Sequence, residues 1–191
     1  MSVSQPTPAA VPPAARLRPM MPADLEVISG LEPELFGAEA WSPAMLAAEL
    51  DRTIGPSADR IYLVAELPAA EGVHQGGWDG APAESVTGGV GPIVGYAGLW
   101  YGDGRGDADL LTIATVPAAR RRGVATALLT ALVRAAVDAG CRAVLLEARA
   151  SNAPAQRLYA THGFAPIGRR RRYYRAPVED AVVMRRRLVS G

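Results

Sequence analysis

The sequence has few of the residues that build disulfide-linked folds and metal sites. Cys141 is the only cysteine among 191 residues, so the chain cannot form an internal disulfide. His74 and His162 are the only histidines, which are too few for a structural zinc site made of cysteine and histidine ligands. We therefore expect neither a disulfide framework nor a bound metal.

Long hydrophobic runs are also missing. No uninterrupted apolar stretch approaches the roughly 20 residues that are needed to cross a bilayer. Residues 1–15 contain four prolines and several alanines but no basic residue. We interpret this segment as a disordered Pro/Ala-rich tail rather than a signal peptide. The expectation is a cytoplasmic protein with no membrane partner.

Lysine is absent, and the 20 arginines nearly balance the 19 acidic residues, which leaves a net charge of +1. Such a chain has no strong overall attraction for nucleic acid, so we expect no direct nucleic-acid contact. The charge is uneven, however, because residues 169–191 carry eight arginines against Glu179 and Asp180. A nonenzymatic module that binds RNA or a ribosomal surface through Arg169–Arg172 therefore stays open as an alternative.

The apolar pattern predicts an α/β protein with a mixed central β-sheet of about six to seven strands flanked by four helices. We expect a single domain over residues 16–189, with a flexible Gly-rich insertion at about 68–92. Ser42 and Pro43 suit the N-cap and first position of a helix. Strands are predicted at 16–18, 61–66, 94–101, 108–116, 143–149, 164–167 and 181–187, and helices at 22–35, 43–50, 124–139 and 153–162.

The most informative stretch is the strand, basic turn and helix that begin at Ile113. The first four amides of a helix have no acceptor within it, and the helix dipole adds partial positive charge, so a helix start favours phosphate. Gly123 would let the backbone approach a ligand, and Arg120–Arg122 would add charge. In the alternative interpretation, Gly123 merely starts the helix and the arginines are solvated.

Two further residues have the chemistry of an acid–base pair. Glu147 lies within an apolar strand, where burial in a cleft would raise its pKa towards that of a useful general base. Its side chain could instead leave the strand end or pair with Arg142 or Arg149. Tyr159 lies on the next helix, and a phenol of pKa ~10 can protonate a departing thiolate of pKa ~8.5. A tyrosine that only packs in the core is the alternative.

The residues 120–125 resemble the Gln/Arg-x-x-Gly-x-Gly/Ala signature of the GNAT acetyltransferases. Residues 146–164 read Leu-Glu-x-Arg-x-Ser-Asn-x-x-Ala-x-x-Leu-Tyr-x-x-x-Gly-Phe, and Arg-Arg-Tyr-Tyr follows at 171–174. These runs are most similar to the RimI subfamily, whose members acetylate the N-terminal alanine of a small-subunit ribosomal protein. The resemblance covers about residues 16–188 apart from the insertion. Ala40 and Ala125 depart from the residues that are usual in this subfamily.

The resemblance implies a role for each matching residue. Glu147 would be the general base, acting through a water, and Tyr159 would protonate the thiolate of coenzyme A. The Val116 amide would lie near the thioester oxygen, and Asn152 would contact the cosubstrate. The backbone that holds the acetyl and pantetheine groups would be that of Ala114, Thr115 and Val116. The amides that bind the pyrophosphate would be those of Arg121, Arg122, Gly123, Val124, Ala125 and Thr126. The acceptor entrance would be shaped by Trp41, Ser42, Tyr173 and Tyr174.

The expected activity is therefore transfer of an acetyl group from acetyl-CoA, without a metal, to the N-terminal α-amine of a protein. The expected partner is the N-terminus of a ribosomal protein. An α-amine of pKa ~8 is mostly protonated at neutral pH, which explains the need for a base. A GNAT enzyme that acetylates a lysine side chain or a small-molecule amine remains an alternative.

Overall fold

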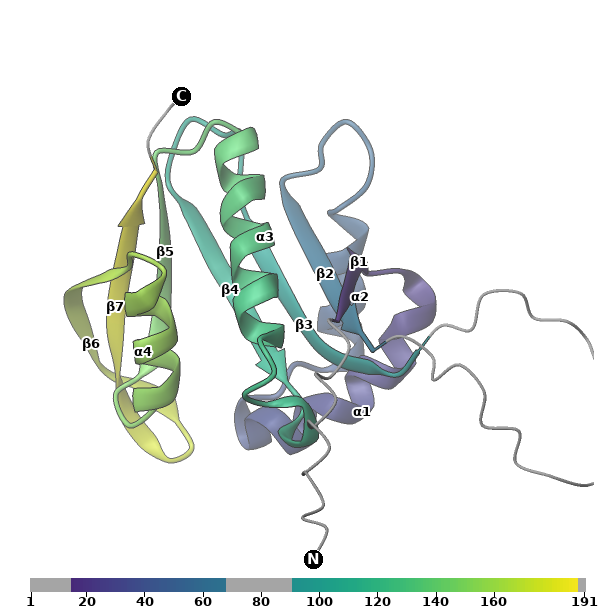
Figure 1. The fold of residues 1–191 in the computed structure, drawn as a ribbon, viewed down its shortest axis with the longest axis horizontal. Coiled ribbons are helices and arrows are strands. Elements are labelled where there is room, and N and C mark those ends of the chain that lie inside the picture. Colours follow the sequence, from purple (N-terminus) through teal and green to yellow (C-terminus); the bar gives the residue numbers. More distant parts are fainter. Residues whose placement is uncertain (1–14, 68–90, 189–191) are drawn as a thin grey trace, which may run out of the picture.

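The computed structural model describes residues 15–67 and 91–188, and these residues form a seven-stranded mixed sheet in the order β1-β2-β3-β4-β5-β7-β6 (Figure 1). The expected tail, apart from Ala15, and nearly all of the expected insertion lie outside the described residues. The strands are β1 (Arg16–Pro19), β2 (Arg60–Glu66), β3 (Ile93–Trp100), β4 (Ala108–Thr115), β5 (Ala143–Arg149), β6 (Ala165–Arg175) and β7 (Val178–Arg187).

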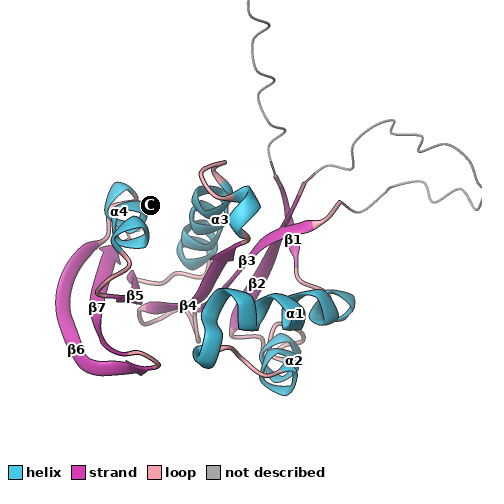
Figure 2. Cartoon of the chain, turned by 90° about the horizontal axis from the view of Figure 1, so that it is seen from below, coloured by secondary structure: helices cyan, strands magenta, loops and turns pink. Residues whose placement is uncertain are grey.

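Helices cover both faces of this sheet (Figure 2). The helices α1 (Leu25–Phe36) and α2 (Pro43–Asp51) lie on one face, and α3 (Val124–Asp138) and α4 (Ala153–Thr161) lie on the other. Short 3-10 helices occur at Pro22–Asp24, Gly37–Glu39 and Pro117–Ala119. No helix in the described part is long and apolar enough to cross a bilayer.

Two hydrophobic cores correspond to these two faces. Leu128, Leu129 and Leu132 of α3 are fully buried in the larger core. Ile28 of α1 and Leu46 of α2 belong to the smaller core on the opposite face. The apolar stripe that was predicted for residues 124–138 therefore packs against the sheet as expected for an amphipathic helix.

Local capping explains where α2 and α4 begin. Ser42 is the N-cap of α2, and its hydroxyl accepts a hydrogen bond of 3.2 Å from the Met45 amide. Asn152 caps α4 in the same way, accepting a bond of 3.1 Å from the Ala155 amide. The predicted N-cap at Ser42 is confirmed.

The sheet opens between its two central strands. All strand pairs are antiparallel except β4 and β5, which run parallel and pair only at Ala108 with Val144 and at Asp109 with Leu145. Beyond Asp109 the two strands diverge (Figure 1). A bulge accompanies this divergence, because Gly98 pairs with Thr112 while Leu99 pairs with Leu110. The extra β4 residue, Leu111, locally bends the strand.

The predicted α/β fold, with its mixed sheet and four helices, is confirmed. The last two strands are longer than the predicted 164–167 and 181–187. Arg169–Arg172 consequently lies inside β6 and not at a strand end. β6 is an edge strand whose residues are nearly all exposed, so it lacks the apolar alternation by which a strand is recognised in a sequence.

Candidate active site

Two adjoining cavities occupy the region where β4 and β5 diverge. The carboxylate cavity, of about 680 Å³, is lined by Glu147 and Asp109 together with aromatic side chains. The amide cavity, of about 750 Å³, lies at the start of α3. The two cavities share the residues Leu35, Phe36, Ile113, Asn152, Ala155 and Tyr159. A ligand bound in the amide cavity can therefore reach the carboxylate cavity.

The amide cavity is built around the N-terminus of α3. Gly123 is the N-cap in the left-handed conformation, with φ of +80°, and no side chain caps the helix. Arg121 also has a positive φ, of +64°. A Cβ atom at Gly123 would have no heavy atom within 4 Å, so its backbone conformation, and not crowding, favours glycine. The first-turn amides at residues 124–126 are left free to bind an anion.

The β4 backbone contributes differently from the expectation. The Val116 amide donates a 3.0 Å hydrogen bond to the Val94 carbonyl, so the predicted role of this amide at a thioester oxygen is wrong. Backbone groups alternate in direction along an antiparallel strand. Since the backbone of residue 116 faces β3, the amides of Ile113 and Thr115 face the opening towards β5. Val116 also lines neither cavity.

Thr115 carries an unpaired polar atom. Its hydroxyl is buried and has no hydrogen-bond partner among the described residues. Its carbonyl accepts a bond of 3.4 Å from Arg120 Nε, which comes from the opening side of β4. A buried polar atom without a partner is rare in a native protein, and here it adjoins a cavity with polar binding groups.

Glu147 lines the carboxylate cavity from β5. Its Oε1 lies 2.9 Å from Nη2 of Arg170, and its side chain is 22% exposed. The cavity therefore holds this carboxylate beside a guanidinium and not in the apolar surroundings that the strand sequence suggested. Neither alternative partner is correct, since Arg149 pairs with Glu179 and no ion pair joins Arg142 to Glu147 among the described residues.

Tyr159 lines both cavities from α4. The residue is only 5% exposed, and its ring packs against Phe164 with the ring centroids 5.9 Å apart. Burial raises the pKa of the Tyr159 phenol well above its ordinary value. The hydroxyl therefore remains protonated throughout the neutral range and is available as a proton donor.

Two tyrosines of β6 form one wall of the carboxylate cavity. The rings of Tyr173 and Tyr174 meet edge to face with centroids 5.1 Å apart, and Arg149 lies 4.1 Å above the Tyr174 ring. The Tyr174 hydroxyl donates a 3.3 Å bond to the Glu147 carbonyl. Burial raises the pKa of Tyr174 to about 12, so this donor keeps its proton.

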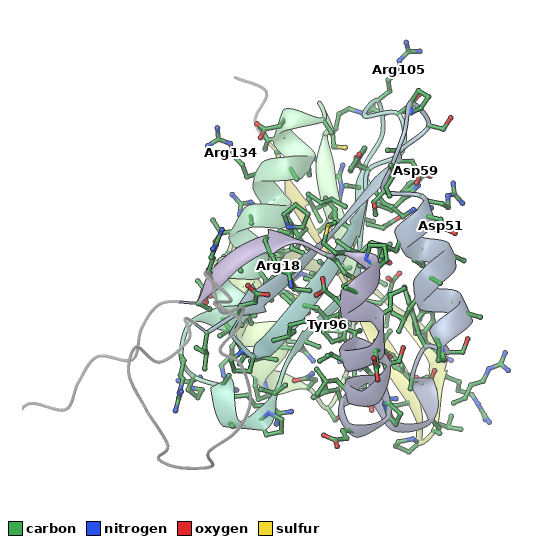
Figure 3. All side chains as sticks on the ribbon, turned by 90° about the vertical axis from the view of Figure 1, so that its right-hand side faces the viewer. Arg18, Asp51, Asp59, Tyr96, Arg105 and Arg134 are labelled. Carbon is green, nitrogen blue, oxygen red and sulfur yellow. The ribbon has the colours of Figure 1, made fainter. Side chains whose placement is uncertain are left out.

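The opposite wall includes Trp41, whose position depends on a residue that the sequence analysis missed. Glu32 of α1 is 1% exposed, and it accepts bonds of 2.8 Å from the Trp41 amide and 2.6 Å from the Tyr96 hydroxyl. Tyr96 is labelled in Figure 3. The sequence held a signal for it, because Glu32 lies one helical turn after the core residue Ile28. An ionisable residue at a core position indicates a specific partner.

Glu39 lines the carboxylate cavity and was also missed by the sequence-based prediction. Its Oε1 accepts bonds of 2.7 Å from the Arg175 amide and 3.3 Å from the Ala176 amide. The Arg175 bond is the main reason that the pKa of Glu39 is lowered. We call this contact the Glu39 latch, since it joins the α1–α2 connection to the β6–β7 turn. No local pattern could reveal it, because its partners are 136 residues apart.

Most of the predicted site residues line one of the cavities. The exceptions in the described part are Ser42, whose exposed hydroxyl caps α2, and Val116 and Arg122. In the amide cavity lie Ala114, Thr115, Arg121, Gly123, Val124, Ala125, Thr126 and Asn152. In the carboxylate cavity lie Trp41, Glu147, Asn152, Tyr159, Tyr173 and Tyr174.

A cavity lined by free helix amides that adjoins a cavity with carboxylate and phenol groups is the kind of site that a group-transfer enzyme requires. The chain belongs to the acetyltransferase (GNAT) family, which it matches over residues 44–164. It is 33% identical to the N-alpha-acetyltransferase RimI of Mycobacterium tuberculosis (strain H37Rv) over 168 residues, which are 86% of this chain and 87% of that protein. The sequence-based resemblance is thereby confirmed.

Other similarities are partial or concern the fold alone. A Bacillus subtilis (strain 168) protein named for N-acetylation of alanine in ribosomal protein bS18 is 36% identical over 49% of this chain, and the match spans 61% of that relative. The crystal structure of the Escherichia coli ribosomal-protein-S18-alanine N-acetyltransferase has a TM-score of 0.67 at 23% identity, with 93% of this chain and 96% of that chain covered. Arabidopsis thaliana NAA60 in complex with acetyl-CoA has a TM-score of 0.68 at 20% identity, with 91% and 98% covered.

Proposed function

We propose that this chain transfers the acetyl group of acetyl-CoA to the N-terminal α-amine of a protein. The acceptor is the N-terminal alanine of a small-subunit ribosomal protein, as the names of the relatives from Bacillus subtilis and Escherichia coli suggest. The observation that carries the proposal is the junction of the two cavities at Tyr159 and Asn152. One cavity fits the cosubstrate and the other fits the amine.

The amide cavity has the donors that acetyl-CoA requires. The free amides at the start of α3 would bind the pyrophosphate, with Arg121 at the rim. The amides of Ile113 and Thr115 would pair with the pantetheine arm along the open edge of β4. One of them would donate to the thioester oxygen, a type of contact whose loss costs about 3 kcal/mol in comparable sites.

The carboxylate cavity supplies the proton transfers. Glu147 would remove a proton from the acceptor ammonium through a water, which makes the nitrogen a nucleophile. Tyr159 would then protonate the departing thiolate, since its raised pKa keeps the phenol protonated. Arg170, which pairs with Glu147, would hold that carboxylate in position.

The aromatic walls support a chain terminus as the acceptor. Trp41 lies on one side of the carboxylate cavity, Tyr173 and Tyr174 lie on the other, and the Glu39 latch joins the two sides. A free N-terminus has no preceding residue to accommodate between these walls. An internal lysine would have to place its side chain between the walls with chain on both sides of it at the entrance.

We expect the enzyme to acetylate peptides that begin with alanine and to leave acetyl-blocked peptides with an internal lysine almost unmodified. Coenzyme A release and mass spectrometry of the peptide would measure the rate and the acetylated position. Equal rates on the two peptides would contradict the proposed acceptor. They would favour lysine or a small amine as the substrate.

Opening the Glu39 latch is expected to weaken this selectivity. In Glu39→Ala the backbone amides of Arg175 and Ala176 lose their acceptor, and we expect the KM of the alanine peptide to rise by up to about tenfold. The KM of acetyl-CoA should stay near the wild-type value, because Glu39 does not line the amide cavity.

Glu34→Ala is the matched control for the latch, since Glu34 is an exposed glutamate on α1 that lines neither cavity. Both peptide KM values should be measured for the two variants. A Glu39→Ala enzyme with the kinetics of the Glu34→Ala enzyme would show that the latch does not shape the acceptor site.

A further inference from the structure

A second carboxylate, that of Asp109, lies in the carboxylate cavity beside Glu147. Asp109 pairs with Leu145 in the last register position before β4 and β5 diverge. Paired residues of parallel strands project to the same face, and Glu147 lies two residues after Leu145. The sheet register therefore directs both carboxylates to the same side, at the narrow end of the opening.

The charged groups that influence Asp109 come from three parts of the chain. Burial raises the pKa of Asp109, the negative charge of Glu147 on β5 raises it further, and Arg170 on β6 lowers it. Asp107, just before β4, has a small raising effect. Asp109 thus holds a proton to higher pH than an ordinary aspartate, which makes its carboxylate a stronger base than that of an ordinary aspartate.

Three other charged side chains of the carboxylate cavity hold its walls in place. Glu32 accepts from Trp41 and Tyr96, the Glu39 latch binds two backbone amides, and Arg149 pairs with Glu179. These contacts position the walls of the cavity. Asp109 and Glu147, which pairs with Arg170, are the two carboxylates that remain for proton transfer.

The reaction itself calls for two proton acceptors. A primary ammonium must lose one proton before its nitrogen can attack, and the nitrogen loses a second proton when the neutral amide forms. One proton ends on the thiol of coenzyme A, and one is released to solvent. A single carboxylate would have to discharge its first proton before it could accept the second.

We propose that Asp109 is a second catalytic carboxylate, which accepts, directly or through one water, one of the two protons lost by the acceptor nitrogen. This inference rests on the proposed acetyl transfer. Glu147 takes the first proton, the N–C bond forms, the C–S bond breaks and Asp109 takes the second proton. Tyr159 protonates the thiolate and regains its proton from one carboxylic acid, and the other carboxylic acid releases its proton to solvent.

The test is the dependence of kcat on pH, with acetyl-CoA and an alanine peptide both saturating. For the wild type we expect the logarithm of kcat to fall on the acidic side with a slope that approaches two protons. In Asp109→Asn we expect kcat to fall by about 10²-fold, the lower end of what a positioned base contributes. Its acidic limb should move to lower pH and become a one-proton limb, because the reaction then requires one deprotonated carboxylate instead of two.

Asp107→Asn is the matched control. Asp107 lies two residues away, pairs with Arg185 at 3.0 Å and lines neither cavity, so the variant should keep the wild-type kcat and the two-proton limb. Asp109→Glu, which restores a carboxylate, should recover the two-proton limb. If Asp109 had a purely structural role, Asp109→Asn would have a lower kcat, but the acidic limb of its pH profile would stay where it is in the wild type.

Three results would overturn the inference: a one-proton limb in the wild type, a wild-type kcat in Asp109→Asn, or a reduced kcat with an unmoved limb. The first of these does not depend on whether a variant folds. A wild type that acetylates only lysine or small amines with a two-proton limb would refute the proposed acceptor and retain the role of Asp109. A wild type that acetylates alanine peptides with a one-proton limb would retain the proposed acceptor and refute the role of Asp109.

Discussion

Replacing Glu147 by glutamine is expected to lower kcat by about 10²- to 10⁴-fold, the range that a positioned general base contributes. Glutamine has nearly the same shape but cannot accept the proton of the acceptor ammonium. The dissociation constant of acetyl-CoA should change little, because Glu147 lines the carboxylate cavity and not the amide cavity. Steady-state kinetics with an alanine peptide and calorimetric titration with acetyl-CoA would measure the two quantities.

Glu34→Gln is a suitable control, since it makes the same chemical change on the exposed side of α1. Raising the pH should partly rescue Glu147→Gln, because a larger fraction of the amine is then already deprotonated when it binds. A variant that loses acetyl-CoA binding, or that keeps the wild-type kcat, would exclude Glu147 as the base.

Replacing Tyr159 by phenylalanine is expected to lower kcat by about 10²-fold, with little change in the KM of acetyl-CoA. The effect should be near the lower end of the range because a thiolate of pKa ~8.5 is a good leaving group even without a proton donor. The ring packing against Phe164 is retained, so the melting temperature should stay close to that of the wild type.

The pH dependence gives a second measure of Tyr159. A proton donor acts in its protonated form, and its contribution is lost as the pH rises through its pKa. Since burial raises that pKa, Tyr159 should produce no decline in kcat at moderately alkaline pH. Tyr101→Phe, outside both cavities, is the control. If Tyr159→Phe has the same kcat as the Tyr101→Phe control, another group must donate the proton to the thiolate.

Sequence patterns predicted those parts of the site that are formed by one continuous segment or by neighbouring elements. The basic turn, Gly123 and the helix that follows form one continuous segment, so its amphipathic spacing and turn chemistry were sufficient to predict the amide cavity. Glu147 and Tyr159 were recognised because they lie on consecutive elements with a shared motif. Neighbouring elements of this kind are the ones that sequence periodicity describes best.

The errors came from features that depend on strand register. The direction of each β4 amide depends on its pairing with β3, so the choice of Val116 over Ile113 and Thr115 could not be tested from the sequence. The placement of Asp109 on the same side as Glu147 depends on the two register positions that join β4 to β5. Arg170 belongs to an exposed edge strand with no apolar alternation, and its pairing with Glu147 was therefore not foreseen.

The two cavities differ in how many separate segments of the chain line them. Most of the amide cavity comes from one stretch near residues 113–126, whereas the carboxylate cavity combines α1, the central strands and the β6–β7 hairpin. Substitutions in the α1–α2 connection or in the hairpin can therefore change the carboxylate cavity and leave the turn before α3 intact. In evolutionary terms, acceptor specificity can diverge among paralogues while the cosubstrate stays the same.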